Sequence, residues 1–424
     1  MLTKNYPTNS LIVLPTFRAI REQLSIATDG FLPKFTTLEE FFKSARFVQN
    51  RQKASGVIRK LLLRKAAVGI SGTVELGFES EFLRFLRNSD FLFRFFDEMI
   101  SEEVKFANLI VSDTYAKFED HLSVLENVWQ KYCELLDKNG LYDNSYPAEF
   151  VVNNSYVNSF DDISFYLGGY TTKKELRIIS EVAKLKPVKT VVTISAHNEK
   201  MCERLKESGF LIEDFGIYEL DWNTKETKYT PNSAICSDLK TICVSRKIDQ
   251  AVLAQDIAFG WVNSGFKAEK IAIVTADESF ASSLKLLDEK RNLNFAMGLQ
   301  DYNAINRLLA LLDSDKTKLQ MLNLVLPNSV QELFDMLNEP IYQDAINIAK
   351  EALRFDTTLS WREVAHIIVS ELSSIDDVGG GKLTVMGLLE TRGAEFDGVV
   401  FLDFDASFAP KPSQKDLFLT TDIK

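Results

Sequence analysis

Short apolar runs alternate with amphipathic stretches along most of the chain. A mainly apolar run of four to seven residues, bounded by glycine, proline or charge, is typical of a strand buried in an α/β sheet. The runs that we expect as strands are 10–14, 163–167, 188–194, 242–245, 270–275, 383–386 and 399–402. Stretches with apolar residues at three- and four-residue steps separate most of them, so the pattern predicts an α/β fold with parallel sheets and right-handed crossovers.

Two long stretches have helical periodicity and no strand-like run. One covers about 52–150 and the other covers about 303–374. We therefore expect two α/β domains, 1–220 and 238–424, each with one of these helical insertions. The polar segment 221–237, DWNTKETKYTPNSAICS, is the expected linker between the domains.

Length and composition agree with a multidomain globular protein. At 424 residues the chain is too long for one ordinary core, and 46% of its residues are hydrophobic. No apolar stretch reaches the roughly 18 residues of a membrane helix, and the N-terminus MLTKNYPTNS has no signal-peptide pattern. A cytoplasmic location without membrane contact is therefore expected. The four cysteines are far apart and only three histidines are present, so we expect no disulfide frame, no zinc site and no cofactor.

The net charge of −11 disfavours general affinity of the surface for nucleic acid, but a local basic stripe would still suffice for phosphate contacts. One such stripe is the pair Arg59-Lys60 followed by Arg64-Lys65 on a helical stretch. It could contact phosphates, but a solvated helix face is the favoured interpretation.

The turn after the first predicted strand has no phosphate-binding sequence. A nucleotide-binding loop of the GxxxxGK[ST] type needs glycines so that backbone N–H groups can approach phosphates, and a lysine that reaches the terminal ones. Here the turn is Leu14-Pro15-Thr16-Phe17-Arg18, without glycine or lysine. ATP hydrolysis is not expected at this position. The segment Val378-Gly379-Gly380-Gly381-Lys382 precedes a strand instead of opening a helix, so a joint is the favoured interpretation.

The most specific local signal is the stretch LTVMGLLETRGAEFDGVVFLDFD at 383–405. Its central part, from Val385 to Asp397, resembles motif V of superfamily 1 helicases, a VxxMTxHxxKGLEF pattern. Arg392-Gly393 stands where that motif has Lys-Gly, and Glu395-Phe396 stands where it has Glu-Phe. Together with 32–42, 125–143 and 271–298, this stretch is similar to AddB-type proteins, the partner subunits of bacterial AddAB helicase–nucleases.

The resemblance implies an inactivated helicase-like scaffold with two RecA-like domains. The chain departs from active motors because it has no Walker loop, has Leu389 where motif V has histidine, and has no acidic pair after the strand 163–167. AddB-type proteins also have a C-terminal nuclease domain with a PD…(D/E)xK site and often an iron–sulfur cluster, and neither is found here. We expect a fragment that is truncated in its second domain, not catalytic by itself, from a full-length exonuclease subunit of DNA repair and recombination.

The resemblance also implies the residues that would bind DNA. They are Thr391, Arg392 and Gly393 in the motif V turn, with Lys411 and Lys415 as weaker additions. For Arg392, a contact with the DNA backbone and an ion pair with Glu390 or Glu395 are equally open alternatives. Asp403 and Asp405 could bind a metal, but a surface turn is favoured because no second acidic cluster accompanies them. No catalytic residue is expected.

Two functions follow from these observations. The first is a non-catalytic subunit that binds single-stranded DNA and docks with an ATP-driven AddA-type motor subunit. The alternative is a protein–protein assembly scaffold without direct DNA contact, which the acidic charge favours. An ATP-driven enzyme is a third possibility with little support, because the Walker loop is missing.

Overall fold

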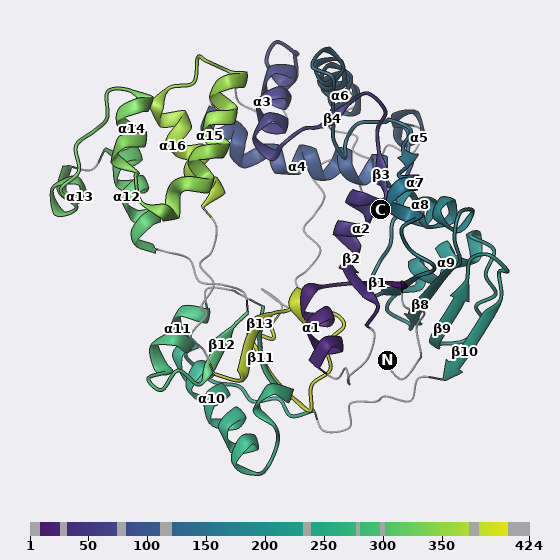
Figure 1. Cartoon of the computed structure of the whole chain (residues 1–424). Coiled ribbons are helices and arrows are strands. Elements are labelled where there is room, and N and C mark those ends of the chain that lie inside the picture. The colour runs from purple at the N-terminus through teal and green to yellow at the C-terminus, as the bar shows by residue number, and fades with distance from the viewer. Residues whose placement is uncertain are drawn as a thin grey trace. The chain divides into compact units, whose positions relative to one another are not determined.

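The structure is a computed structural model, and its ribbon is drawn in Figure 1. It describes residues 9–25, 32–73, 82–110, 121–231, 239–276, 280–296, 302–314, 316–372 and 381–405. The expected α/β class is confirmed, because helices and strands alternate and the larger sheets contain parallel strands. No helix among these residues is both long enough and apolar enough to cross a membrane.

The chain folds as two compact units, each built from separate stretches of sequence. Unit 1 takes the described residues within 1–49, 149–299 and 376–413, and unit 2 takes those within 50–148 and 300–375. The two helical insertions that we expected in separate domains thus fall in one unit, and the strands on either side of them fall in the other.

Unit 1 contains a six-stranded sheet in the order β10-β9-β8-β7-β1-β2. The strands are β1 (Leu11–Leu14), β2 (Lys34–Thr37), β7 (Ile163–Leu167), β8 (Val188–Ile194), β9 (Gly216–Asp221) and β10 (Thr227–Pro231). The four strands β2, β1, β7 and β8 are parallel, whereas β9 and β10 are antiparallel to their neighbours. The sheet is therefore mixed. Strand β10 lies inside the segment 221–237, which we expected to be a linker. Its backbone pairs with β9, and polar side chains such as Lys228 remain exposed.

Two helices of unit 1 are capped by the threonines that precede them. The helices of this part are α1 (Phe17–Ser25), α2 (Leu38–Ser44), α7 (Asn154–Val157), α8 (Lys173–Ala183) and α9 (Glu199–Glu207), with a short antiparallel pair β3 (Arg46–Phe47) and β6 (Val151–Val152). Thr37 caps α2 by accepting a hydrogen bond from Glu40 N, and Thr172 forms a capping box with Glu175 at the start of α8.

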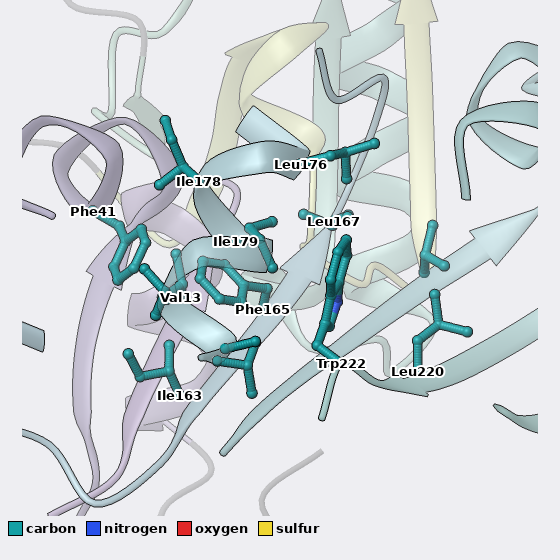
Figure 2. Packing of buried hydrophobic residues seen from close by; sticks show 14 of the residues in the cluster. Val13, Phe41, Ile163, Phe165, Leu167, Leu176, Ile178, Ile179, Leu220 and Trp222 are labelled. Carbon is teal, nitrogen blue, oxygen red and sulfur yellow. The ribbon is translucent and has the colours of Figure 1, made fainter. Parts of the chain in front are cut away.

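The core beneath this sheet is aromatic at its centre (Figure 2). The rings of Phe41 and Phe165 are 4.8 Å apart and perpendicular, an edge-to-face arrangement that aromatic side chains prefer. Trp222 is also buried, and its indole N–H donates to Thr190 Oγ1 at 2.7 Å. The polar atom of this ring is therefore satisfied. Burial of the indole stabilises the packing of Trp222, which directly follows β9, against β8.

A second sheet of unit 1 is wholly parallel, in the order β12-β13-β11-β14. Its elements are α10 (Lys247–Asn263), η1 (Ala268–Lys270), β11 (Ile271–Thr275), α11 (Phe280–Leu287), β12 (Leu293–Phe295), β13 (Leu383–Gly387), η3 (Leu389–Thr391) and β14 (Gly398–Leu402). The strands predicted at 383–386 and 399–402 are confirmed, and both flank β11. The strand predicted at 242–245 is wrong: this segment is irregular, and Ile242 is 57% exposed.

Unit 2 is a helical unit with one small parallel strand pair. Its elements are β4 (Gln52–Lys53), α3 (Gly56–Ala67), α4 (Phe82–Ser101), α5 (Phe106–Ile110), α6 (His121–Lys138), β5 (Leu141–Tyr142), α12 (Tyr302–Asp313), α13 (Lys316–Met321), α14 (Val330–Met336), η2 (Pro340–Tyr342), α15 (Gln343–Phe355) and α16 (Trp361–Glu371).

Helix α3 contributes to two hydrophobic cores of unit 2. Leu62 packs in a core with Phe96 of α4, whereas its neighbour Leu61 packs in a core with Ala349 of α15. Because α3 is apolar on two sides, it joins the helices of the early insertion to those of the late one. This shared helix is the physical reason why the two insertions form a single unit.

Candidate functional site

The turn between β1 and α1 lies against the turn that follows β13. Thr16 Oγ1 accepts a hydrogen bond from Ala19 N at 3.2 Å and so caps α1, and it donates to the carbonyl oxygen of Arg392 at 3.0 Å. We call this region the α1–η3 junction and define it by residues 15–22 and 387–397. Both turns follow the carboxyl ends of parallel strands, where open α/β sheets bind their ligands. In Figure 1, α1 lies beside the yellow segment that contains β13.

Gly393 is packed closely against α1. Its φ is +75°, a conformation that residues with a side chain rarely adopt. A Cβ atom at this position would lie 2.8 Å from the Cβ of Ala19 and 3.5 Å from Pro15. The glycine is therefore required both by its backbone conformation and by the close approach of the two turns. The side chain of Thr391 stays within its own turn, since its hydroxyl donates to the carbonyl of Leu388 at 2.7 Å.

Glu22 connects α1 to two further residues of the junction. Its carboxylate accepts from Lys270 Nζ at 2.7 Å and from the backbone N–H of Glu395 at 2.9 Å. Lys270 Nζ also donates to the carbonyl of Glu395 at 3.1 Å. The hydrogen bond that Lys270 donates to Glu22 is the main cause of the raised pKa of Lys270. This network satisfies the polar groups of the turn and holds its backbone against α1.

Arg18 places a second cation at the junction. Its guanidinium is half-buried and lies 3.5 Å from Thr384 Oγ1. Burial lowers the pKa of Arg18, and the nearby charge of Arg21 lowers it further, while the carboxylates of Glu390 and Glu22 oppose the shift. Glu22 is thus shared between two cations of the junction, with a hydrogen bond to Lys270 and a weaker electrostatic effect on Arg18.

Arg392 is exposed at this junction, while its backbone is held by Thr16. Within the described ranges its guanidinium makes no ion pair, although Glu390 and Glu395 are close in sequence. The turn therefore fixes the position of the residue and leaves its positive charge accessible. Of the other residues expected to bind DNA, Thr391 and Gly393 lie in the same turn, whereas Lys411 and Lys415 lie outside the described residues.

The turn after β1, which has no phosphate-binding sequence, packs against other segments of unit 1. Gly168, at the end of β7, has Pro15 so close that a Cβ atom would lie 2.9 Å from the proline ring. On the other side, Gly393 and the carbonyl of Arg392 contact Ala19 and Thr16. The turn after β1 therefore contacts the segments that follow β7 and β13 instead of forming an open loop for phosphates.

The basic face of α3 is a row of ion pairs. Arg59 lies 2.8 Å from Asp97, Arg64 lies 3.4 Å from Glu363, and Lys65 lies 3.4 Å from Asp356. Lys60 lies 3.9 Å from Asp90. These contacts link α3 to neighbouring helices of unit 2, so the phosphate-binding interpretation of this face loses its basis.

Arg59 lies in the most buried part of this row. It also bonds Asp143, and Tyr132 donates to the same carboxylate. Ser145 accepts from Arg59 at 3.1 Å, and the guanidinium lies 4.1 Å from the ring centre of Phe93. Burial raises the pKa of Asp97, and Arg59 opposes this shift. The network is a structural link between α3, α4 and α6.

Asp403 lies in a different environment from the expected surface turn. It is buried, adopts a left-handed φ of 52°, and lies 3.6 Å from Lys247 Nζ. Its backbone N–H donates to the side chain of Gln250 at 3.2 Å. In the part of the chain that the structure describes, no group of three or more His, Cys, Asp or Glu side chains is placed to hold a metal ion. Residues 378–380 of the glycine-rich segment Val378–Lys382, which we interpreted as a joint, lie outside the described residues.

Sequence patterns did not identify Thr16, Glu22 and Lys270 as partners of the motif V-like turn. The cap at Thr16 had a local signal, a threonine directly before a helical stretch. The pair Glu22 and Lys270 had no local sequence signal, because 248 positions separate the two residues. No protein-family model matches the chain, and no curated protein matches its sequence. The likeness to motif V therefore depends on the residues quoted above.

Proposed function

We propose that this chain is a non-catalytic, helicase-like part of a subunit that acts in DNA double-strand-break repair and recombination. In this proposal its two sheets belong to two RecA-like domains of the superfamily 1 type. The chain binds single-stranded DNA and an AddA-type ATP-driven subunit, and it uses no cofactor of its own. The observation that carries the proposal is the α1–η3 junction, where the turn after β1 packs against Gly393 and Arg392.

Two features of the junction support this function. The position of a Walker loop contains Pro15, Thr16 and Ala19 in contact with other turns, which argues against ATP turnover by this chain. Arg392 is exposed on a turn whose backbone is held by Thr16, and a phosphate contact needs a cation at a fixed place. The motif V resemblance supplies the substrate class, single-stranded DNA.

The alternative function is an assembly scaffold without DNA contact. The net charge of −11 favours it, because an acidic surface repels the DNA backbone. In this case the junction would serve only to hold the two sheets of unit 1 together.

Fluorescence anisotropy of a labelled single-stranded oligonucleotide, titrated with the whole chain at several salt concentrations, separates the two functions. If the chain binds DNA, the logarithm of affinity falls linearly with the logarithm of salt concentration. Arg392→Ala should then reduce the slope by about 0.7, the value for one lost phosphate contact with a single strand. Lys228→Ala is a matched loss of charge on the edge strand β10 and should leave the slope unchanged. Absence of binding at low salt would contradict the proposal and favour the scaffold.

A further inference from the structure

Two aromatic side chains are exposed after the ends of neighbouring strands, one within the α1–η3 junction and one beside it. Phe17 is the first residue of α1, directly after β1, and is 59% exposed. Tyr170 follows β7, the strand paired with β1, and is 50% exposed. Single exposed apolar side chains are common on proteins, so each one alone has little meaning. Their placement next to the exposed Arg392 sets these two apart from scattered surface residues.

Both aromatic residues directly follow or nearly follow a residue that lies against Arg392. Phe17 directly follows Thr16, whose hydroxyl lies 3.0 Å from the carbonyl oxygen of Arg392. Tyr170 is two residues after Gly168, where a Cβ atom would lie 3.8 Å from the Cβ of Arg392. Two residues of extended chain span at most about 7 Å, so Arg392 is within side-chain reach of both positions.

The two rings differ in how they are held. Tyr170 is oriented by Arg204, whose Nη2 donates to the phenol oxygen at 3.0 Å and whose guanidinium lies 5.9 Å from the ring centre. Phe17 makes no aromatic contact with any other described residue. Its ring is therefore available to another planar group.

The charges around the junction leave Arg392 as an accessible cation. Arg392 is exposed and makes no ion pair with a described residue, while Glu22 is bonded to Lys270 at 2.7 Å. An exposed cation with an exposed aromatic residue on each of two adjoining turns is the combination that binds single strands without sequence preference. In such sites the cation neutralises a phosphate and the rings stack on bases.

We propose that Phe17 and Tyr170 are base-stacking residues for single-stranded DNA, on either side of the phosphate that Arg392 contacts. This inference rests on the proposed function and adds the residues that would recognise bases. Double-stranded DNA does not fit this role, because its bases are already stacked and paired and offer no free face to a side chain.

The test measures anisotropy with a labelled single-stranded oligonucleotide and fluorescence with one that contains 2-aminopurine, whose emission falls when it stacks. Phe17→Ala and Tyr170→Ala should each weaken binding about five- to a hundredfold, with the salt slope unchanged because no charge is lost. Phe17→Trp and Tyr170→Phe retain a ring and should retain affinity and quenching. Phe215→Ala is the matched control, since Phe215 is also 59% exposed but precedes β9.

The results separate this inference from the proposed function. Normal binding and quenching by Phe17→Ala and Tyr170→Ala, with a reduced salt slope in Arg392→Ala, would overturn the stacking role and leave the proposed function standing. An equal loss in Phe215→Ala would also overturn the stacking role. Absence of binding by the wild-type chain would overturn both. Thermal melts of each variant check folding, and because Phe17 and Tyr170 are exposed, we expect unchanged melting temperatures.

Discussion

The carboxylate of Glu22 lies 2.7 Å from the ammonium group of Lys270, although 248 positions separate the two residues in sequence. The side chain of Glu22 is only 15% exposed, and that of Lys270 is 33% exposed. Glu22 also accepts from the backbone of Glu395, so a single side chain connects α1, η1 and the turn before β14. A partly buried carboxylate with two charge-assisted or backbone partners contributes more to stability than a solvent-exposed ion pair.

Substitution of this carboxylate should destabilise unit 1. Glu22→Gln keeps the shape but removes the charge and one acceptor, so we expect the free energy of unfolding to fall by about 1 to 3 kcal/mol. The loss of unfolding free energy is measured by urea unfolding that is monitored through hydrogen exchange of peptides from α1 and β11. The control is Glu181→Gln, which removes the exposed pair of Glu181 and Lys184 on α8 and should cost less than about 1 kcal/mol. Equal losses in the two variants would contradict the assigned role of Glu22.

The same pair predicts a dependence on alkaline pH. Glu22 raises the pKa of Lys270 above its ordinary value of 10.5 in the folded state. The stabilisation is therefore fully present below that value and is lost as the pH rises through the raised folded pKa. The stability difference between wild type and Glu22→Gln should shrink at higher pH, and a difference that stays constant would show that the ammonium group is not involved.

Gly393→Ala should destabilise the α1–η3 junction for two separable reasons. The new Cβ would meet Ala19 at 2.8 Å, and the φ of +75° would be strained, so we expect a loss of about 1 to 3 kcal/mol. The double variant Gly393→Ala with Ala19→Gly removes the clash and retains the strain, so a double-mutant cycle should give a favourable coupling energy. Gly169→Ala is the control, because nothing lies within 4 Å of a Cβ there. Additive losses in the cycle would contradict the contact with Ala19.

Removal of Arg59 should strongly destabilise unit 2. Arg59→Met leaves Asp97 and Asp143 partly or fully buried without their cation, and breaking such a pair costs about 3 to 5 kcal/mol. The neighbouring substitution Lys60→Met removes only a pair with the 68% exposed Asp90 and should cost less than about 1 kcal/mol. Hydrogen exchange in peptides from α3, α4 and α6 measures both, and similar protection in the two variants would contradict this prediction.

The loss in Arg59→Met should depend on pH in a defined direction. Burial already raises the pKa of Asp97 above 3.8 in the folded wild-type protein, and loss of the arginine removes the effect that opposes this shift. The folded variant then binds protons more readily than the unfolded chain, so its stability rises as the pH falls towards the raised pKa. The deficit relative to wild type should be smaller at pH 5 than at pH 8 in the same exchange measurement. If the stability difference between Arg59→Met and wild type grows on acidification, the predicted effect of the buried Asp97 carboxylate is wrong.

Local patterns predicted the strands better than they predicted their partners. The apolar runs that became β13 and β14 were found because burial in a parallel sheet selects continuous apolar sequence. The run at 242–245 has a similar composition but stays irregular, since nothing in a local window shows whether a sheet position exists for it. Strand β10 was missed for the opposite reason, because an edge strand tolerates polar residues and a proline.

The candidate site could be found only in part. Arg392 and Gly393 stand in a stretch that resembles a known motif in sequence, whereas the contact with Thr16 joins positions 376 residues apart. The basic face of α3 also could not be interpreted locally. Its partners Asp356 and Glu363 lie in the late insertion, and only the shared packing of α3 brings these charges together.

Because α3 packs in two cores, it has to wait for helices that are synthesised much later. Leu61 and Leu62 face two cores, one completed by α4 and α6, the other by α15 and α16. A ribosome adding 5 to 20 residues per second needs roughly 15 to 60 s to travel from the end of α3 to the end of α16. During that interval one side of α3 has no partner on the nascent polypeptide. The early insertion therefore lacks these native neighbours for that whole interval, and a holding chaperone would protect its exposed apolar side.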